Sequence, residues 1–268
     1  MVTILRAGLA LVFSMLLVAT ATAQTKPRVT ELGGDDPASI IYIGNSFFYF
    51  NNGMGGHVSR LYASSEGAKK LRSTDVTISG SSLQWHDVDS YFRPNAVGAF
   101  SFDADNNVVF NKNDKLFEVA VMMDCSQCPI HPELKSQFTE YAKKDSDIVR
   151  KHGGKPVLFM SWAYQNKPEM TAALAEAYTI AGNDNGALVI PAGLAFARVV
   201  KEHPEITLYI SDKRHPTLAG SYLAASTTYA ALFHRSPVGL QYTAGLEEKT
   251  AGILQEAAWA TASDYYGR

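Results

Sequence analysis

Residues 39–48 read SIIYIGNSFF, a short apolar run that ends in Gly44, Asn45 and Ser46. A short run rich in β-branched residues is typical of a strand buried on both faces of a sheet. Four further runs have the same character: residues 76–79 (VTIS), 117–123 (FEVAVMM), 156–160 (PVLFM) and 187–190 (ALVI). The sequence therefore predicts five short buried strands.

Stretches with helical spacing of apolar residues separate these strands. They are residues 53–65, 132–152 and 168–180, with a further helix expected over 217–233. Strands that alternate with helices of this length indicate a parallel sheet covered on both faces. We expect an α/β fold, a three-layer α/β/α sandwich around a flavodoxin-like five-stranded parallel sheet.

Composition limits the possible classes. The chain has 268 residues, of which 46% are hydrophobic, and its net charge is -2. Such a chain can form a sizeable core, and it lacks the basic surface that nucleic-acid binding requires. The only departure from the α/β rhythm is residues 97–112, which resemble an inserted β-hairpin. We expect one domain over residues 24–268.

The first 23 residues have the pattern of a signal peptide. Arg6 provides a positive charge, residues 7–18 are apolar except for Ser14, and Ala21-Thr22-Ala23 offers a small-x-small cleavage site. The apolar run is short for a membrane span, although an uncleaved anchor is the alternative. We expect export to the periplasm or the extracellular space after cleavage near Ala23, without stable membrane insertion.

In proteins with an open parallel sheet, catalytic and binding residues usually lie at the carboxyl ends of the strands. Ser46 follows the first run there, and Gly80 follows the second. Asp212 and His215 follow residues 207–210, which we expect to be extended. A serine hydroxyl needs a base such as histidine to become nucleophilic, and an aspartate three residues earlier can orient that histidine. Taken singly, each motif also fits a turn or a helix cap.

Gly44-Asn45-Ser46 and Asp212-x-x-His215-Pro216, in this order, resemble the first and last blocks of the SGNH/GDSL hydrolase superfamily. The resemblance implies Ser46 as nucleophile, with His215 and Asp212 completing a catalytic triad. It also implies that the backbone N–H groups of Ser46 and Gly80 line an oxyanion hole. Residues 80–86, Gly-Ser-Ser-Leu-Gln-Trp-His, resemble one branch of that superfamily.

The third block departs from the family pattern. The superfamily has an asparagine there as third oxyanion donor, whereas residues 123–128 read MDCSQC. Gln127 is the one side chain in this stretch with an amide N–H. We expect it to act as the substitute donor, or else the loop is only held by its cysteines.

Cys125 and Cys128 are the only cysteines. In an exported protein a local disulfide is favoured, with two free thiols as an alternative. A redox-active pair is a further reading, and so is a zinc site that would recruit His86 and His131. We expect no metal and no cofactor.

For the remaining histidines and for Trp162 the sequence mostly favours ordinary structural roles. Trp162 is expected to pack at the rim of the site, or else to stack on a sugar. His86 lies either on the pocket wall or on a solvated helix face. His57, His152, His203 and His234 are expected at the surface.

The sequence thus predicts an exported serine ester hydrolase acting on an acylated carbohydrate or a small acyl ester. One alternative is a non-catalytic protein of the same fold that binds glycan or lipid. A thiol oxidoreductase that uses Cys125 and Cys128 is the other.

Overall fold

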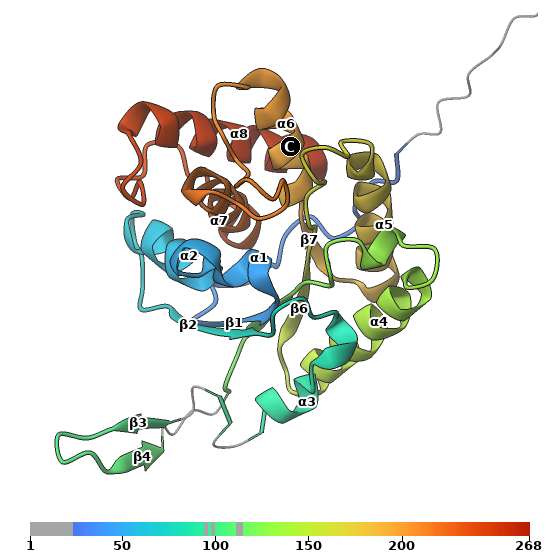
Figure 1. Ribbon diagram of the computed structural model, residues 1–268. Coiled ribbons are helices and arrows are strands. Elements are labelled where there is room, and N and C mark those ends of the chain that lie inside the picture. The colour runs from blue at the N-terminus through green and yellow to red at the C-terminus, as the bar shows by residue number, and fades with distance from the viewer. Residues whose placement is uncertain (1–23, 94–95, 98–99, 111–114) are drawn as a thin grey trace, which may run out of the picture.

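The computed structural model describes residues 24–93, 96–97, 100–110 and 115–268, so the expected signal peptide lies outside the described residues. A five-stranded parallel sheet with the order β2-β1-β5-β6-β7 forms its centre (Figure 1). Its strands are β1 (Ser39–Gly44), β2 (Arg72–Thr77), β5 (Val119–Met122), β6 (Lys155–Phe159) and β7 (Leu188–Ile190). Strands β1 and β5 are buried along their whole length, as their apolar runs predict.

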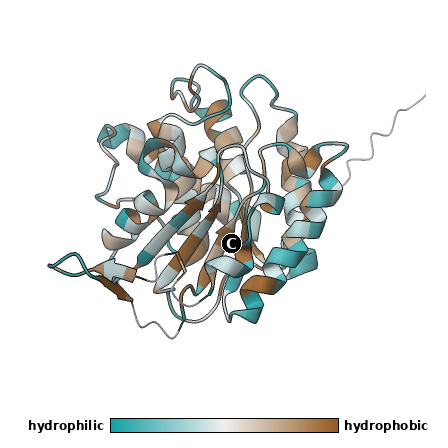
Figure 2. Ribbon diagram, turned by 60° about the horizontal axis from the view of Figure 1, so that its bottom comes forward, coloured by the Kyte–Doolittle hydropathy of each residue, from teal (hydrophilic) through white to brown (hydrophobic). Residues whose placement is uncertain are grey.

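Helices cover both faces of the sheet, which confirms the predicted three-layer sandwich. One layer holds α2 (Met54–Ala63), α6 (Ala192–Glu202), α7 (Leu218–Phe233) and α8 (Glu248–Tyr266) (Figure 1). The other holds α3 (Val88–Tyr91), α4 (Lys135–Lys151) and α5 (Met170–Asn185). In Figure 2 much of the central sheet is brown, whereas the helices around it include more teal, hydrophilic residues. No helix in the described part of the chain is long and apolar enough to cross a bilayer.

The strand register brings three loops to one edge of the sheet. Gly44 at the end of β1 lies beside Thr77 of β2, and Ile43 lies beside Met122 of β5. Four short helical segments occupy the loops at or after these strand ends: α1 (Ser46–Tyr49), η1 (Phe50–Asn52), η2 (Leu83–Trp85) and η3 (Cys128–Ile130). The segments after β1, β2 and β5 therefore meet.

Two expected strands differ from the structure. The second strand spans Arg72–Thr77 instead of residues 76–79, because β2 is an edge strand and its first half is polar and only partly buried. Residues 207–210 are not a strand of the sheet. Tyr209 forms one isolated antiparallel bridge with Pro216, so this segment closes a tight loop onto the chain that follows it.

A separate two-stranded sheet lies within residues 97–112. Strands β3 (Phe100–Phe102) and β4 (Val108–Phe110) pair antiparallel and extend away from the rest of the molecule (Figure 1). Their large apolar side chains are exposed. The chain leaves the core at Phe92 and returns at Phe117, whose rings meet edge to face at 5.6 Å.

Candidate active site

Ser46 is the first residue of α1, directly after β1. The N-cap of this short helix is Asn45, whose side-chain oxygen accepts the N–H of Phe47 at 3.2 Å. Because Asn45 caps the helix, the hydroxyl of Ser46 is not used as a cap. The Oγ atom of Ser46 instead lies 2.8 Å from Nε2 of His215.

His215 and Asp212 share one tight loop. The carboxylate of Asp212 lies 2.5 Å from Nδ1 of His215, and its other oxygen accepts the backbone N–H groups of His215 and Arg214 at 3.0 and 2.9 Å. Burial raises the pKa of Asp212, but these hydrogen bonds outweigh it and lower that pKa to about 2. Asp212 is therefore an anion at neutral pH.

The backbone around His215 is held from outside the loop. The indole N–H of Trp162 donates to the carbonyl oxygen of Arg214 at 2.9 Å, and the N–H of Gln165 donates to that of Lys213 at 2.9 Å. Pro216 lies two residues before the first residue of α7. Thr217 is the N-cap of α7, because its hydroxyl accepts the N–H of Gly220.

Aromatic rings support both sides of the imidazole. Phe50 stacks on His215 with 4.4 Å between centroids and 10° between planes, and Phe47 meets it edge-on at 5.7 Å. Phe47 in turn stacks on Trp162, which is fully buried and also stacks on Phe196. Trp162 is thus a packing residue, and the sugar-stacking reading of it is wrong.

Asn45 also joins the three loops that follow β1, β2 and β5. Its side-chain amide donates to the carbonyl oxygens of Ser81 at 3.0 Å and Asp124 at 3.2 Å. The carboxylate of buried Asp124 accepts the N–H groups of Leu83 and Cys125. Sequence reasoning treated Asn45 as part of a motif and missed this role, since only the fold shows which loops it joins.

Gly80 lies in a turn after β2 with φ +71°, a left-handed conformation that favours glycine. Its N–H has no acceptor among the described residues. The N–H of Ser46, the other expected oxyanion donor, belongs to the first residue of α1, where helices leave N–H groups without an intrahelical partner.

Gln127 directs its amide to a neighbouring phenol. Its Nε2 donates to the hydroxyl of Tyr164 at 2.8 Å, and that hydroxyl also bonds Ser126 Oγ at 2.7 Å. Tyr164 is buried, and the guanidinium of Arg214 lies over its ring at 4.9 Å. This network attaches the loop after β5 to the residue that precedes His215.

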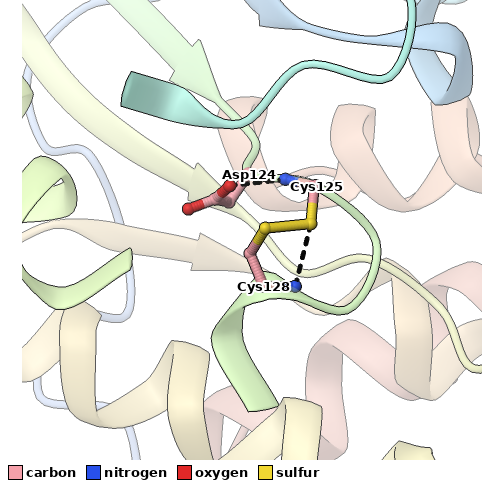
Figure 3. A group of neighbouring side chains, drawn as sticks. All are labelled: Asp124, Cys125 and Cys128. Atoms are coloured by element: carbon pink, nitrogen blue, oxygen red, sulfur yellow. Dashed lines mark hydrogen bonds between the residues drawn. A yellow bond between two sulfur atoms is a disulfide. The ribbon is translucent and has the colours of Figure 1, made fainter. Parts of the chain in front are cut away.

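Cys125 and Cys128 form a disulfide (Figure 3). The zinc set with His86 and His131 is not assembled, because the nitrogens of His86 bond Ser81, Gly44 and Tyr91. The donor atoms of Asp124, Cys125 and Cys128 do lie within 4.8 Å of one another, yet the two sulfurs are bonded to each other.

Three of the four histidines expected at the surface are not fully exposed, namely His57, His152 and His203. His57 is buried, its Nδ1 lying 2.8 Å from the hydroxyl of Tyr242 and its Nε2 2.6 Å from the carbonyl oxygen of Asn51. Burial lowers the pKa of His57. His152 is partly buried and stacks on Phe92. The spacing of residues along the sequence could not have predicted these contacts of His57 and His152.

The structure thus combines an α/β sandwich with a serine, a histidine and an aspartate in hydrogen-bond sequence at the carboxyl edge of the sheet. No protein-family model matches the sequence, and no curated protein matches it at a significant level. Solved structures do share the fold, and several of them are described as SGNH or GDSL hydrolases.

Three of these structures show the extent of the likeness. A DUF4886-family protein from Bacteroides uniformis aligns with a TM-score of 0.58 and 19% identity over 85% of this chain and 95% of its own. A candidate SGNH hydrolase from Slackia heliotrinireducens aligns with a TM-score of 0.53 and 20% identity over 72% and 97%. A variant of an acetyl-xylooligosaccharide esterase from a Geobacillus species aligns with a TM-score of 0.50 and 14% identity over 81% of this chain and 98% of its own.

Proposed function

We propose that the protein is a serine ester hydrolase that transfers an acyl group through Ser46. The observation that carries this proposal is the chain of contacts from Ser46 Oγ to His215 Nε2 and from His215 Nδ1 to the Asp212 carboxylate. A serine that only shapes a turn does not require a histidine beside it, whereas a nucleophilic serine requires an imidazole base that an ionised carboxylate orients.

In the acylation step, His215 Nε2 takes the hydroxyl proton as Ser46 Oγ forms a bond to the acyl carbon. The carbonyl oxygen becomes an oxyanion, to which the N–H groups of Ser46 and Gly80 donate, with Gln127 as third donor. The imidazolium then gives its proton to the alcohol oxygen as the ester bond breaks. Water, activated by the same imidazole, releases the acid in a second round.

Asp212 keeps the imidazole in the tautomer that accepts a proton at Nε2, and its negative charge stabilises the imidazolium. Every step uses side chains and backbone groups of this chain, so we propose that no cofactor is required.

For the substrate we propose an acylated carbohydrate or a small acyl ester. The structural neighbour described as an acetyl-xylooligosaccharide esterase supports this class. We further propose cleavage of residues 1–23 and export, which N-terminal sequencing of the protein from its native host would test by recovering Gln24 as first residue.

The test is covalent labelling with a fluorophosphonate, which reacts only with an activated serine. We expect labelling of the full chain, its loss in Ser46→Ala, and its retention in the control variant Ser79→Ala. Absence of labelling together with binding of a glycan or lipid would establish the non-catalytic alternative. Activity that survives Ser46→Ala would instead implicate Cys125 and Cys128.

A further inference from the structure

Three groups of the segment after β2 lie within hydrogen-bond distance of the carbonyl oxygen of Gly44. The backbone N–H of Ile78 donates to this oxygen at 3.0 Å and the hydroxyl of Ser81 at 3.1 Å, and Nε2 of His86 lies 3.1 Å from it. A carbonyl oxygen has two lone pairs, so three partners crowd it. Gly44 is the last residue of β1 and precedes Ser46 by two residues. The segment after β2 is therefore bonded to the strand end that carries the serine.

Two of these groups lie on either side of Gly80. The N–H of Ser81 donates to the carbonyl oxygen of Ile78 at 3.1 Å, which closes a turn with Gly80 as its third residue. The φ of +71° at Gly80 fits that position in a type II turn. The side-chain amide of Asn45 donates to the carbonyl oxygen of Ser81 at 3.0 Å. Because Ile78 and Ser81 both donate to Gly44, the peptide that carries the Gly80 N–H is held at both ends of its turn.

The hydrogen bonds of His86 determine which of its nitrogens carries the proton. The carbonyl oxygen of Gly44 can only accept, so its contact with Nε2 assigns the proton to that nitrogen. Nδ1 then accepts from the hydroxyl of Tyr91 at 3.1 Å. The side chain is buried, and burial lowers the pKa of His86, so the ring is mostly neutral at neutral pH. A neutral ring matches this pair of partners, one acceptor and one donor.

The two expected oxyanion donors lie on opposite sides of this junction. The N–H of Ser46 begins α1, and the N–H of Gly80 has no acceptor among the described residues. Such donors act on the transition state only when they are already placed where the negative charge develops. Strand β2 is at the edge of the sheet and has only β1 beside it. The bonds to Gly44 therefore hold the Gly80 turn where no second strand does.

We propose that His86 is a positioning residue for the oxyanion hole, since its donation from Nε2 to Gly44 keeps the Gly80 N–H in place beside the Ser46 N–H. The inference rests on the proposed ester hydrolysis. His86 acts through Gly44 and Ser81 and not on the acyl group itself. Its removal should therefore lower kcat with little change in KM, because the contact that it supports strengthens as the oxyanion forms.

The experiment compares a p-nitrophenyl ester that the wild type cleaves with the matched thionoester, in which sulfur replaces the carbonyl oxygen. Sulfur is a weak hydrogen-bond acceptor, so the ratio of the two kcat/KM values reports on the oxyanion hole. His86→Ala should lower kcat for the ester, and this ratio, about 10-fold, which is less than the roughly 10²–10³-fold cost of deleting a donor. His86→Gln keeps an N–H donor on a side chain of similar length and should recover most of both.

His57→Ala is the matched control. His57 is also buried, and its ring nitrogens likewise lie beside a tyrosine hydroxyl and a backbone carbonyl oxygen, those of Tyr242 and Asn51. That carbonyl is not next to an expected oxyanion donor. The substitution should therefore leave the ester-to-thionoester ratio unchanged, whatever its effect on stability.

An unchanged ratio in folded His86→Ala would overturn the inference, and so would an equal fall in His57→Ala. Circular dichroism shows whether each variant is folded. If His86→Ala does not fold, Ser81→Ala takes its place, because it removes another donor to Gly44. The ratio should then fall several-fold, and an unchanged ratio in Ser81→Ala overturns the inference.

Fluorophosphonate labelling of the wild type separates this inference from the proposed function. Labelling together with an unchanged ratio in the variants would remove the role of His86 and leave the hydrolase proposal standing. A wild type that is neither labelled nor active on any ester would remove both.

Discussion

The side-chain amide of Asn51 donates a hydrogen bond to the carbonyl oxygen of Pro216 at 3.0 Å, across 165 residues of sequence. It also donates to Ser221 Oγ at 2.8 Å, while Phe50 stacks on His215. Two consecutive residues that follow the serine helix therefore hold the imidazole and the residue after it. The hydrogen bond from Asn51 to Pro216 therefore helps to hold His215 in contact with Ser46, in addition to the stacking of Phe50.

Asn51→Asp should lower kcat about 10-fold with little change in KM. The substitution keeps the size of the side chain and tolerates the left-handed backbone at φ 53°, but a carboxylate cannot donate to Pro216. Loss of one such hydrogen bond corresponds to about 1–2 kcal/mol, which displaces His215 without unfolding the chain. Steady-state kinetics on any ester that the wild type cleaves measures this.

The matched control for that substitution is Asn52→Asp. Asn52 also has a left-handed backbone, at φ 72°, and it is exposed. Equal kinetic effects of the two variants would show that the link to Pro216 does not position the imidazole.

Gln127→Ala should lower kcat about 10²-fold while KM changes little, because an oxyanion contact strengthens only as negative charge develops. Tyr164→Phe removes the phenol that holds the amide and should cause a smaller loss. The kinetics are to be measured with and without a reductant. A nearly silent Gln127→Ala together with sensitivity to reductant would mean that the disulfide alone maintains the loop.

The contributions of Asp145 and Asp124 to stability should fall as pH rises from about 4 to 7, whereas buried His57, whose pKa is lowered, contributes in the opposite direction. The folded chain holds Asp145 with a pKa of about 7 and Asp124 with a pKa of about 6, against an ordinary value of 3.8. Their stabilisation is fully present below the ordinary value and is lost as pH rises through the raised values. Asp145→Asn should remove a large part of this slope, on the order of a few kcal/mol, in urea unfolding at a series of pH values.

Asp147→Asn serves as the control on the same helix. Asp147 is exposed and pairs with Lys143, and a hydrogen bond from that lysine lowers its pKa. A pH slope unchanged by Asp145→Asn would show that Asp145 is not the group that titrates.

Deletion of residues 97–112 should leave the fold intact and shift the melting temperature by only a few degrees. The rings of Phe92 and Phe117 on either side of the hairpin are 5.6 Å apart, and the side chains of β3 and β4 are exposed. The deletion therefore removes little buried apolar area. Loss of a cooperative transition in differential scanning calorimetry would show that the hairpin is part of the core.

The pattern of apolar residues in the sequence was sufficient to predict the fold, because buried parallel strands are short continuous apolar runs. Residues 39–43 and 156–160 are runs of this kind. The pattern was insufficient for β2, since an edge strand exposes polar residues and its boundaries depend on pairing with β1. Residues 207–210 look extended for the same reason that strands do, but their partner is Pro216 and not the sheet.

The order of Gly44-Asn45-Ser46 and Asp212-x-x-His215 along the chain, with its resemblance to the SGNH/GDSL pattern, was enough to predict that the serine, the aspartate and the histidine lie together. Only the tertiary structure decided what holds them. Asn45 joins three loops, Asn51 reaches Pro216, and His86 reaches Gly44. These relations depend on the distance in space between residues far apart in sequence, and hydrophobic periodicity records only whether a residue faces the core.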